Sequence, residues 1–383
     1  MSLRNEQISA FLQERINAGD FPSAVYLVAE KGEIVFQDAL GYAVVEPERI
    51  EARLDTIYDL ASLTKVLVTG LLTARLIESG ELQTDDRLHR YLPQFDTVEK
   101  REITIENLLA HSAGFPAWLP FYLIASERSE VPAKLSETRL EKPPGNSVIY
   151  SDPGFAVLTF VIEKLAGERL DGFARREIFG PLGLRHTLFC PLLEMRRQIA
   201  ANEFGNEFEK QMCLDLGYEN EVRKPPAYAG GSDFRTGVIW GEVHDGNALF
   251  MDGVASHAGI FSSPEEVFKI ALQFLPNHTR LLKPETCELF RTNFTKGMNE
   301  DRSFAFQLAS TKDSTAGSRM SPESFGHTGF TGTSLWIDPV KDRIFVLLTN
   351  RTHMHPLPFV NINAVRRRFH QLSIELLENK ASN

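Results

Sequence analysis

The chain has 383 residues, of which 43% are hydrophobic and 24% charged, a composition typical of folded globular proteins. Its formal net charge of −10 at pH 7 argues against nucleic acid or an anionic membrane surface as a partner. The sequence has no apolar run of about 18 residues, so we expect no membrane-spanning helix. Three widely spaced cysteines, Cys190, Cys213 and Cys287, fit neither a disulfide framework nor a zinc site.

The N-terminus carries no signal-peptide pattern, because Met1-Ser2-Leu3-Arg4 leads directly into a helical pattern. We therefore expect a cytoplasmic protein for the chain as written, and a periplasmic or secreted one if a leader has been removed. The sequence predicts no oligomeric state.

The first part of the chain is predicted to form a helix and a hairpin. Apolar residues recur at helical spacing over residues 5–18. Two strand-like runs follow, Ala24 to Ala29 and Glu33 to Ala39, on either side of a turn at Lys31-Gly32.

The middle of the chain is mainly helical. A long apolar helix is predicted after Ser62, with Gly80 as its C-terminal cap. Residues 81–240 are punctuated by proline and glycine, and a further helix is predicted from Gly154 to Gly167. Residues 200–250 read as one long loop system, because they are polar and rich in glycine and aromatic residues.

Near the end of the chain, two strands are predicted, Thr331 to Asp338 and Arg343 to Asn350. A helix is predicted after them, over residues 361–378. Strands at both ends with helices between predict an α/β (α+β) fold, with an antiparallel sheet flanked by helices. We expect residues 1–75 and 245–383 to form the α/β domain. Residues 76–244 would form an inserted, mainly helical lobe, with one active site in the cleft between the two.

The first candidate catalytic residue is Ser62, which stands where a short apolar run ends and a helical pattern begins. Residues three apart share a helix face, so the Ser62 hydroxyl and the Lys65 amine can meet. A serine hydroxyl needs an adjacent base to act as a nucleophile, and a lysine in a dry pocket can lose its proton and be that base. The helix N-terminus adds unpaired N–H groups that favour an oxyanion. About one Ser-x-x-Lys is expected by chance in such a chain, so the interpretation depends on partners.

Two further motifs supply those partners. Tyr150-Ser151-Asp152 follows a Pro-Pro-Gly loop and precedes a helix, and His327-Thr328-Gly329 precedes a strand. Taken alone, Tyr150 is better interpreted as a buried aromatic residue with a satisfied hydroxyl than as a catalytic one. The order Ser-x-x-Lys, Tyr-x-Asp, His-Thr-Gly is much more specific than any one of them.

With these motifs the chain resembles the serine β-lactamase and penicillin-binding-protein superfamily, and within it the branch of class C β-lactamases, DD-carboxypeptidases and esterases. The resemblance spans roughly residues 5–355 and implies a β-lactamase/transpeptidase-like fold. Supporting stretches are Leu108 to Phe115, Pro181 to Leu184 and Gly253 to Ser262.

The resemblance also implies roles for individual residues. Ser62 would be the acylated nucleophile, and Lys65 and Tyr150 would share the proton traffic. The backbone N–H groups of Ser62 and Phe330 would form the oxyanion hole. The strand from His327 would bind an extended substrate through Thr328 and Gly329.

Two departures from the family pattern bear on the substrate. Asp152 stands where many members have asparagine, and its carboxylate can accept an ion pair from Lys65 but cannot donate. His327 stands where most β-lactamases have lysine, and histidine is mostly neutral at pH 7, so it lacks the fixed charge that a β-lactam carboxylate would meet. Asp152 and His327 are therefore predicted to contact substrate without favouring strong β-lactamase activity.

Other candidate residues receive a plainer interpretation. His111 and His257 are predicted to be core and loop histidines. His353 and His355 alternate as metal ligands can, but no third ligand is near, so we expect no metal. The triplet Arg366-Arg367-Arg368 on the last helix reads as a solvated face rather than a phosphate site.

The sequence thus predicts a serine hydrolase that needs no cofactor and forms an acyl-enzyme on an ester or a D-alanyl peptide, with room for weak β-lactamase activity. One alternative is a true class C-like β-lactamase. A second is a protein that binds cell-wall peptide or penicillin on the same scaffold without turnover, although the intact set of Ser62, Lys65 and Tyr150 argues against it.

Overall fold

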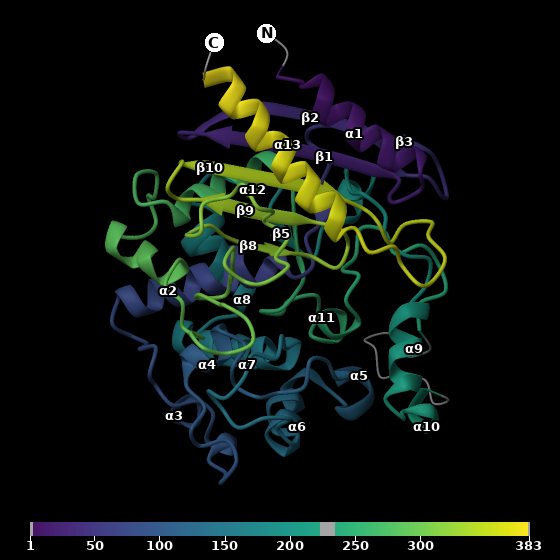
Figure 1. Ribbon diagram of the computed structural model, residues 1–383. Helices are drawn as coiled ribbons and strands as arrows, with labels where there is room; N and C mark the ends of the chain where they lie inside the picture. The colour runs from purple at the N-terminus through teal and green to yellow at the C-terminus, as the bar shows by residue number, and fades with distance from the viewer. Residues whose placement is uncertain (1–2, 223–233, 382–383) are drawn as a thin grey trace.

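The computed structural model describes residues 3–222 and 234–381, and its centre is a seven-stranded sheet (Figure 1). Its strands are β1 (Ser23–Glu30), β2 (Glu33–Val44), β3 (Ile50–Glu51), β7 (Gln307–Leu308), β8 (Phe325–Thr328), β9 (Ser334–Asp338) and β10 (Arg343–Thr349). The strand order is β3-β2-β1-β10-β9-β8-β7, and each neighbouring pair is antiparallel. The predicted antiparallel sheet, with strands from both ends of the chain, is confirmed.

The two faces of the sheet are both covered, which explains why β1 and β10 are almost continuously apolar. Tyr26 and Val28 of β1 pack into a core with helices α1 (Glu6–Asn17) and α13 (Asn363–Ala381), which lie together over one face (Figure 1). The alternate residues Val25 and Leu27 belong to a larger core on the other face, with α12 (Pro264–Ala271). This period-two alternation places the helices on opposite sides of one sheet.

Most other helices belong to the middle of the chain. The α-helices are α2 (Leu71–Glu78), α3 (Leu88–Tyr91), α4 (Ile105–Leu109), α5 (Phe121–Ile124), α6 (Val131–Glu137), α7 (Asp152–Ala166), α8 (Leu170–Ala174), α9 (Glu207–Asp215), α10 (Glu219–Val222) and α11 (Gly246–Phe250). Short 3₁₀ or π segments are η1 (Lys65–Gly70), η2 (Pro93–Phe95), η3 (Arg128–Glu130), η4 (Arg175–Phe179), η5 (Leu193–Gln198), η6 (Leu272–Phe274) and η7 (Pro284–Phe290). No helix in the described ranges is long and apolar enough to cross a membrane.

A second, three-stranded sheet connects the middle of the chain with the main sheet. Its order is β4-β6-β5, with β4 (Tyr58–Asp59), β5 (Leu188–Phe189) and β6 (Ile260–Ser262). Asp59 pairs with Phe261, so the stretch that leads into Ser62 lies beside the predicted family stretch at residues 253–262. The division into domains at residues 75 and 245 stays a prediction.

Two element predictions are wrong. The strand expected over Thr331 to Asp338 begins only at Ser334, because Gly329 N–H bonds to the Thr333 carbonyl (2.8 Å) and closes a tight turn that includes Gly332 at φ +112°. The loop expected over residues 200–250 contains the helix α9, whose buried side chains, Glu209 and Cys213, give no apolar stripe in the sequence. Residues 223–233 of that stretch lie outside the described residues.

Candidate active site

Ser62 lies just after β4, at a backbone turn that other residues hold in place. Ala61 has φ +47°, a conformation that is strained for a residue other than glycine. The Asp59 carboxylate accepts a hydrogen bond from Ala61 N–H (2.8 Å), and the Thr64 hydroxyl donates to the Ala61 carbonyl (2.7 Å). These contacts fix the side chain of Ser62 at the start of the helical segment η1, as the sequence predicted.

Lys65 is fully buried and reaches three acceptors. Its Nζ lies 3.0 Å from Ser62 Oγ, 2.6 Å from Asp152 Oδ1 and 3.0 Å from the His257 carbonyl oxygen. The structure therefore brings Ser62 and Lys65 together and forms the predicted ion pair with Asp152.

The charge on Lys65 is set by its neighbours. Burial lowers the pKa of Lys65, but the charge of Asp152 and the interaction with Tyr150 raise it, and the net pKa lies above the ordinary lysine value. Lys65 is thus held as an ammonium in the resting site. Desolvation alone would favour a neutral Lys65, but Asp152 outweighs it in the resting site. Which of Lys65 and Tyr150 is the general base stays a prediction.

Tyr150 completes the group around Ser62. Burial raises the pKa of Tyr150 above its ordinary value, Lys65 lowers it, Asp152 raises it, and hydrogen bonds with Lys65 and Ser62 lower it in part. Tyr150 is accordingly a phenol in the resting site, within hydrogen-bonding contact of both Ser62 and Lys65. The ring stacks at 4.5 Å on His111.

His111 and His257 are buried residues that hydrogen-bond to segments around the active site. His111 Nδ1 accepts a hydrogen bond from Ser151 N–H (3.0 Å), which fixes the loop carrying Tyr150. The His257 ring pairs with Asp245 (3.1 Å), while its carbonyl holds Lys65. Neither ring contacts the Ser62 hydroxyl, and both are buried, which fits the prediction of core and loop histidines rather than catalytic ones.

The end of β8 packs directly on the Ser62 turn. A Cβ added to Gly329 would lie 2.5 Å from the Leu60 carbonyl oxygen, so only glycine permits this approach. Thr331 Oγ1 donates to the Asp59 carbonyl (2.8 Å) and Thr333 Oγ1 to the Leu60 carbonyl (3.0 Å). The backbone that leads into the serine is therefore held at two consecutive residues, Asp59 and Leu60.

The two N–H groups expected to form an oxyanion hole remain available. Neither the Ser62 N–H nor the Phe330 N–H donates to an acceptor in residues 3–222 or 234–381. Beyond Gly326, β8 also has an open edge in the described structure, because β7 pairs only with Phe325 and Gly326. His327 and Thr328 can therefore offer backbone groups to an extended substrate.

Two cavities meet at Ser62. Both are bordered by Ser62, Tyr150, Asp152, Phe208 and Phe330. The larger, about 590 Å³, is further lined by Arg302, Gln307, His327, Thr328, Gly329, Arg351, Pro358, Phe359, Asn361, Asn363 and Arg366. The smaller, about 260 Å³, is further lined by Ala61, Ala117, Trp118, Glu209, Met212, His244, Asp245 and Ala258.

Sequence reasoning missed the three arginines of the larger cavity. Arg366 is 5% exposed, and its Nη2 donates to the Gly329 carbonyl (2.8 Å), so the interpretation of this arginine as part of a solvated face is wrong. The sequence did contain a signal for this burial, because Ile362 and Phe369 are buried and lie on the same side of the helix as Arg366.

The other two arginines of the larger cavity are Arg302 and Arg351. Arg302 is as buried as Arg366 and pairs with Glu300 (2.7 Å). Arg351 Nε donates to the Phe330 carbonyl (2.7 Å).

His327 is neutral, as predicted, but it is not the source of charge in the cleft. Burial, followed by the charges of Arg302 and Lys65, lowers the pKa of His327 well below its ordinary value. Position 327 therefore brings no fixed positive charge, but Arg302, Arg351 and Arg366 line the same cavity and bring positive charge of their own. A β-lactam is therefore not disfavoured on that ground.

The described residues contain no group of three or more histidine, cysteine, aspartate or glutamate side chains arranged to hold a metal ion. His353, considered above as a metal contact, bonds with both ring nitrogens to backbone. Its Nδ1 pairs with the Asn202 carbonyl (2.8 Å), and its Nε2 accepts from Val45 N–H (2.9 Å).

Comparison with known proteins assigns the family. The family model described as Beta-lactamase matches residues 8–367. The chain belongs to the β-lactamase family. An Escherichia coli K12 relative, provisionally named a D-alanyl-D-alanine carboxypeptidase, is 32% identical over 378 residues, covering 91% of this chain and 83% of the relative.

Solved structures of this family share the fold. EstCE1, described as a hydrolase with promiscuous acyltransferase activity, superposes with a TM-score of 0.72 at 21% identity, covering 95% of this chain and 97% of its own. A penicillin-binding protein homologue from Caulobacter crescentus gives 0.71 at 17% identity, covering 97% and 99%. This β-lactamase-family member is an enzyme, a serine hydrolase.

Proposed function

We propose that this serine hydrolase removes the C-terminal D-alanine of a short D-alanyl peptide through an acyl-enzyme on Ser62. The Ser62 oxygen attacks the scissile carbonyl and forms an ester, and the amine of D-alanine leaves with a proton. Water then cleaves the ester and restores the hydroxyl. The free N–H groups of Ser62 and Phe330 would bind the oxyanion in both steps.

The observation that carries this proposal is the arginine-lined cavity at Ser62. A peptide that ends in D-alanine places a carboxylate close to the scissile bond. Arg302, Arg351 and Arg366 line this cavity and give it positive charge. A carboxylate in the cavity is attracted by that charge. A neutral ester gains no such attraction.

Proton transfer is supported by the pairing of Lys65 with Asp152. Because Lys65 is an ammonium at rest, it can accept the Ser62 proton only if it gives one up. Asp152, at 2.6 Å, is the neighbouring carboxylate that can receive it. The pair, neutral overall at rest, would then hold one extra proton, as the Lys65 ammonium and a neutral Asp152. Tyr150 would protonate the departing amine, and the pair would return its extra proton to the Tyr150 oxygen through Lys65.

The experiment compares Nα-acetyl-L-lysyl-D-alanyl-D-alanine with the same peptide amidated at its C-terminus. We expect D-alanine release from the free acid to exceed cleavage of the amide at least about tenfold in kcat/KM, and Ser62→Ala to abolish it. Arg366→Met should reduce the preference for the free acid. Arg368→Met is the matched control, since Arg368 is exposed on the same helix.

A β-lactam is the second candidate, because its carboxylate would also fit the arginine-lined cavity. A chromogenic cephalosporin is therefore assayed beside the peptide. Turnover of the cephalosporin above that of the peptide would assign a β-lactamase instead. Equal cleavage of the acid and the amide would remove the argument from the arginines.

A further inference from the structure

The smaller cavity at Ser62 has the opposite electrostatic character to the larger one. Besides Asp152, which borders both cavities and pairs with Lys65, two carboxylates line it, Glu209 from α9 and Asp245 from the turn before α11. Trp118, Phe208 and Met212 are among its apolar lining residues, and His244, which pairs with Glu203 (2.8 Å), also borders it. A cavity with aromatic walls and carboxylates at one end suits a cation carried on an alkyl chain.

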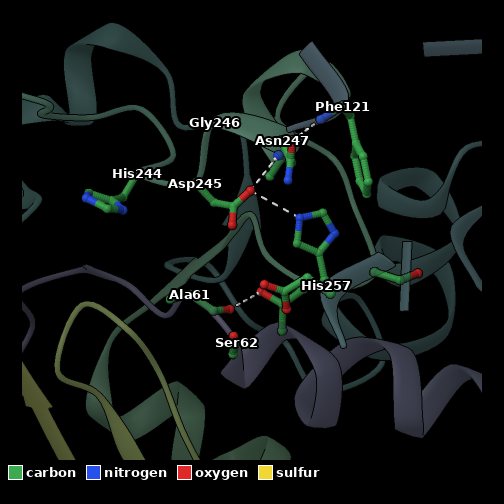
Figure 2. Close-up of polar contacts among 12 residues, drawn as sticks. Ala61, Ser62, Phe121, His244, Asp245, Gly246, Asn247 and His257 are labelled. Atoms are coloured by element: carbon green, nitrogen blue, oxygen red, sulfur yellow. Dashed lines mark hydrogen bonds and ion pairs between the residues drawn. The ribbon is translucent and has the colours of Figure 1, made fainter. Parts of the chain in front are cut away.

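Asp245 is a fixed negative charge with one oxygen directed into the cavity. Its Oδ1 accepts hydrogen bonds from Ala248 N–H (2.7 Å) and from His257 (3.1 Å). Figure 2 shows the second oxygen pointing toward Ala61 and Ser62, and it accepts from no residue that the structure describes. Burial raises the pKa of Asp245, but His257, Ala248 N–H and Lys65 lower it below the ordinary value, so the carboxylate stays ionised.

Glu209 is held rigidly beside it. Its side chain is buried, its Oε1 accepts from Gly246 N–H (2.7 Å), and its Oε2 accepts from the Tyr122 hydroxyl (3.1 Å). Burial and the charge of Asp245 raise the pKa of Glu209 to about 7. Two carboxylates that disfavour each other's charge are both stabilised when a cation lies between them.

We propose that the smaller cavity binds a primary ammonium group on the acyl part of the substrate, with Glu209 and Asp245 as its carboxylate partners. Trp118 and Phe208 enclose the alkyl chain that carries it. The substrate is then a peptide with an ammonium in the part retained on Ser62 and a carboxylate in the part that departs. This inference rests on the proposed acyl-serine reaction.

The test uses two p-nitrophenyl esters that differ only at the far end of the acyl chain. The 6-aminohexanoate ends in an ammonium, and the heptanoate ends in a methyl group of similar size. We expect the wild-type enzyme to favour the 6-aminohexanoate at least about tenfold in kcat/KM, and Glu209→Gln or Asp245→Asn to bring the ratio towards one. An apolar cavity would favour the heptanoate.

Glu266→Gln is the matched control, since Glu266 is also a buried glutamate that accepts backbone hydrogen bonds but lines neither cavity. It should keep the wild-type ratio. Equal turnover of the two esters by wild type, or a ratio unchanged in Glu209→Gln, overturns the ammonium site. Turnover that survives Ser62→Ala overturns the acyl-serine function instead.

Binding of 5-aminopentylboronic acid and hexylboronic acid, measured by calorimetry, gives a readout that needs no turnover. Boronic acids add reversibly to a reactive serine and present the same two chain ends. Tighter binding of the amino compound to wild type, lost in Glu209→Gln, supports the site. Equal affinities, or no binding of either compound, count against it.

Discussion

At the scale of single residues, the chemistry of the site is set by the ion pair between Lys65 and Asp152. Both side chains are withdrawn from bulk water, at 0% and 17% exposure, and their atoms approach to 2.6 Å. An asparagine at position 152 would leave Lys65 buried without its strongest partner. Desolvation would then lower the pKa of Lys65.

Asp152→Asn separates two accounts of the base. If neutral Lys65 alone were the base, the variant should be faster at pH 7–8, because its lysine loses a proton more readily. The proton relay predicts the reverse, since the proton acceptor is removed, and we expect kcat to fall by about 10²-fold or more. The pH dependence of kcat and kcat/KM, measured on protein shown by circular dichroism to be folded, decides between them. A rate gain at pH 7 would refute the relay.

At the scale of elements, β8 and the turn after it position the Ser62 backbone. The turn is clamped to residues 59 and 60 by Thr331 and Thr333. Arg366 Nη2 also donates to the carbonyls of Gly329 (2.8 Å) and Thr333 (3.0 Å), so α13 holds the turn from the far side. The proposed oxyanion donor, Phe330, therefore lies in a segment fixed from two directions.

Gly329→Ala tests this arrangement. The added methyl group would lie 2.1 Å from Thr333 Oγ1 and 2.5 Å from the Leu60 carbonyl oxygen, so β8 must move away from the Ser62 turn. We expect a stability loss of about 1–3 kcal/mol and a fall in kcat of up to about 10²-fold, because a shift of this kind misplaces the oxyanion donor.

Gly237→Ala is the matched control, because its Cβ would meet no atom of the described residues within 4 Å. It should keep the wild-type activity and melting temperature. A Gly329→Ala variant with wild-type kcat would show that the proximity of β8 to Ser62 is not needed for turnover.

At the scale of the whole molecule, the sheet could be predicted and parts of the cleft could not. The strands β1 and β10 are nearly continuous apolar runs, and their signal is local. The position of Arg302 depends on a contact with the Tyr150 ring (5.4 Å) that only the folded chain brings about. The burial of Arg366 was not recognised because two further arginines follow it, although its position on the helix indicated a buried side chain.

The meeting of Ser62, Lys65 and Tyr150 was predictable for a different reason. The first two residues are close in sequence, and the third was found through the family resemblance rather than through any local pattern. Glu209 had no such signal, because α9 lacks an apolar stripe and its buried residues include that carboxylate. The two carboxylates of the smaller cavity, Glu209 and Asp245, are therefore recognised as neighbours only in the folded chain, where α9 packs against the turn at Gly246.

His370 couples the stability of the whole molecule to pH. It lies on α13, its Nδ1 donates to the Thr315 carbonyl (2.7 Å), and its ring packs against Trp336 and Phe345. Burial lowers the pKa of His370 to about 3, against the partial opposition of the Thr315 hydrogen bond and with a further lowering by Arg366. An unfolded histidine has a pKa near 6.5.

Between these two pKa values the unfolded chain binds a proton that the folded chain does not. The stability due to neutral His370 is therefore fully present above about pH 6.5 and is lost progressively as the pH falls from there toward 3. Between pH 6.5 and pH 5, this one residue should cost about 2 kcal/mol of the free energy of unfolding.

His370→Gln cannot take up that proton and can still donate to Thr315. We expect its free energy of unfolding, from urea melts at pH 7.5 and pH 5.0, to fall less between the two pH values than that of the wild type, by about 2 kcal/mol. His186→Gln, at a partly exposed histidine, should show the wild-type fall. If both variants lose as much stability as the wild type, His370 does not cause the acid sensitivity, and two other buried histidines, His111 and His327, become the candidates. Their pKa values are also lowered well below the ordinary value by burial, followed by the charge of Arg302.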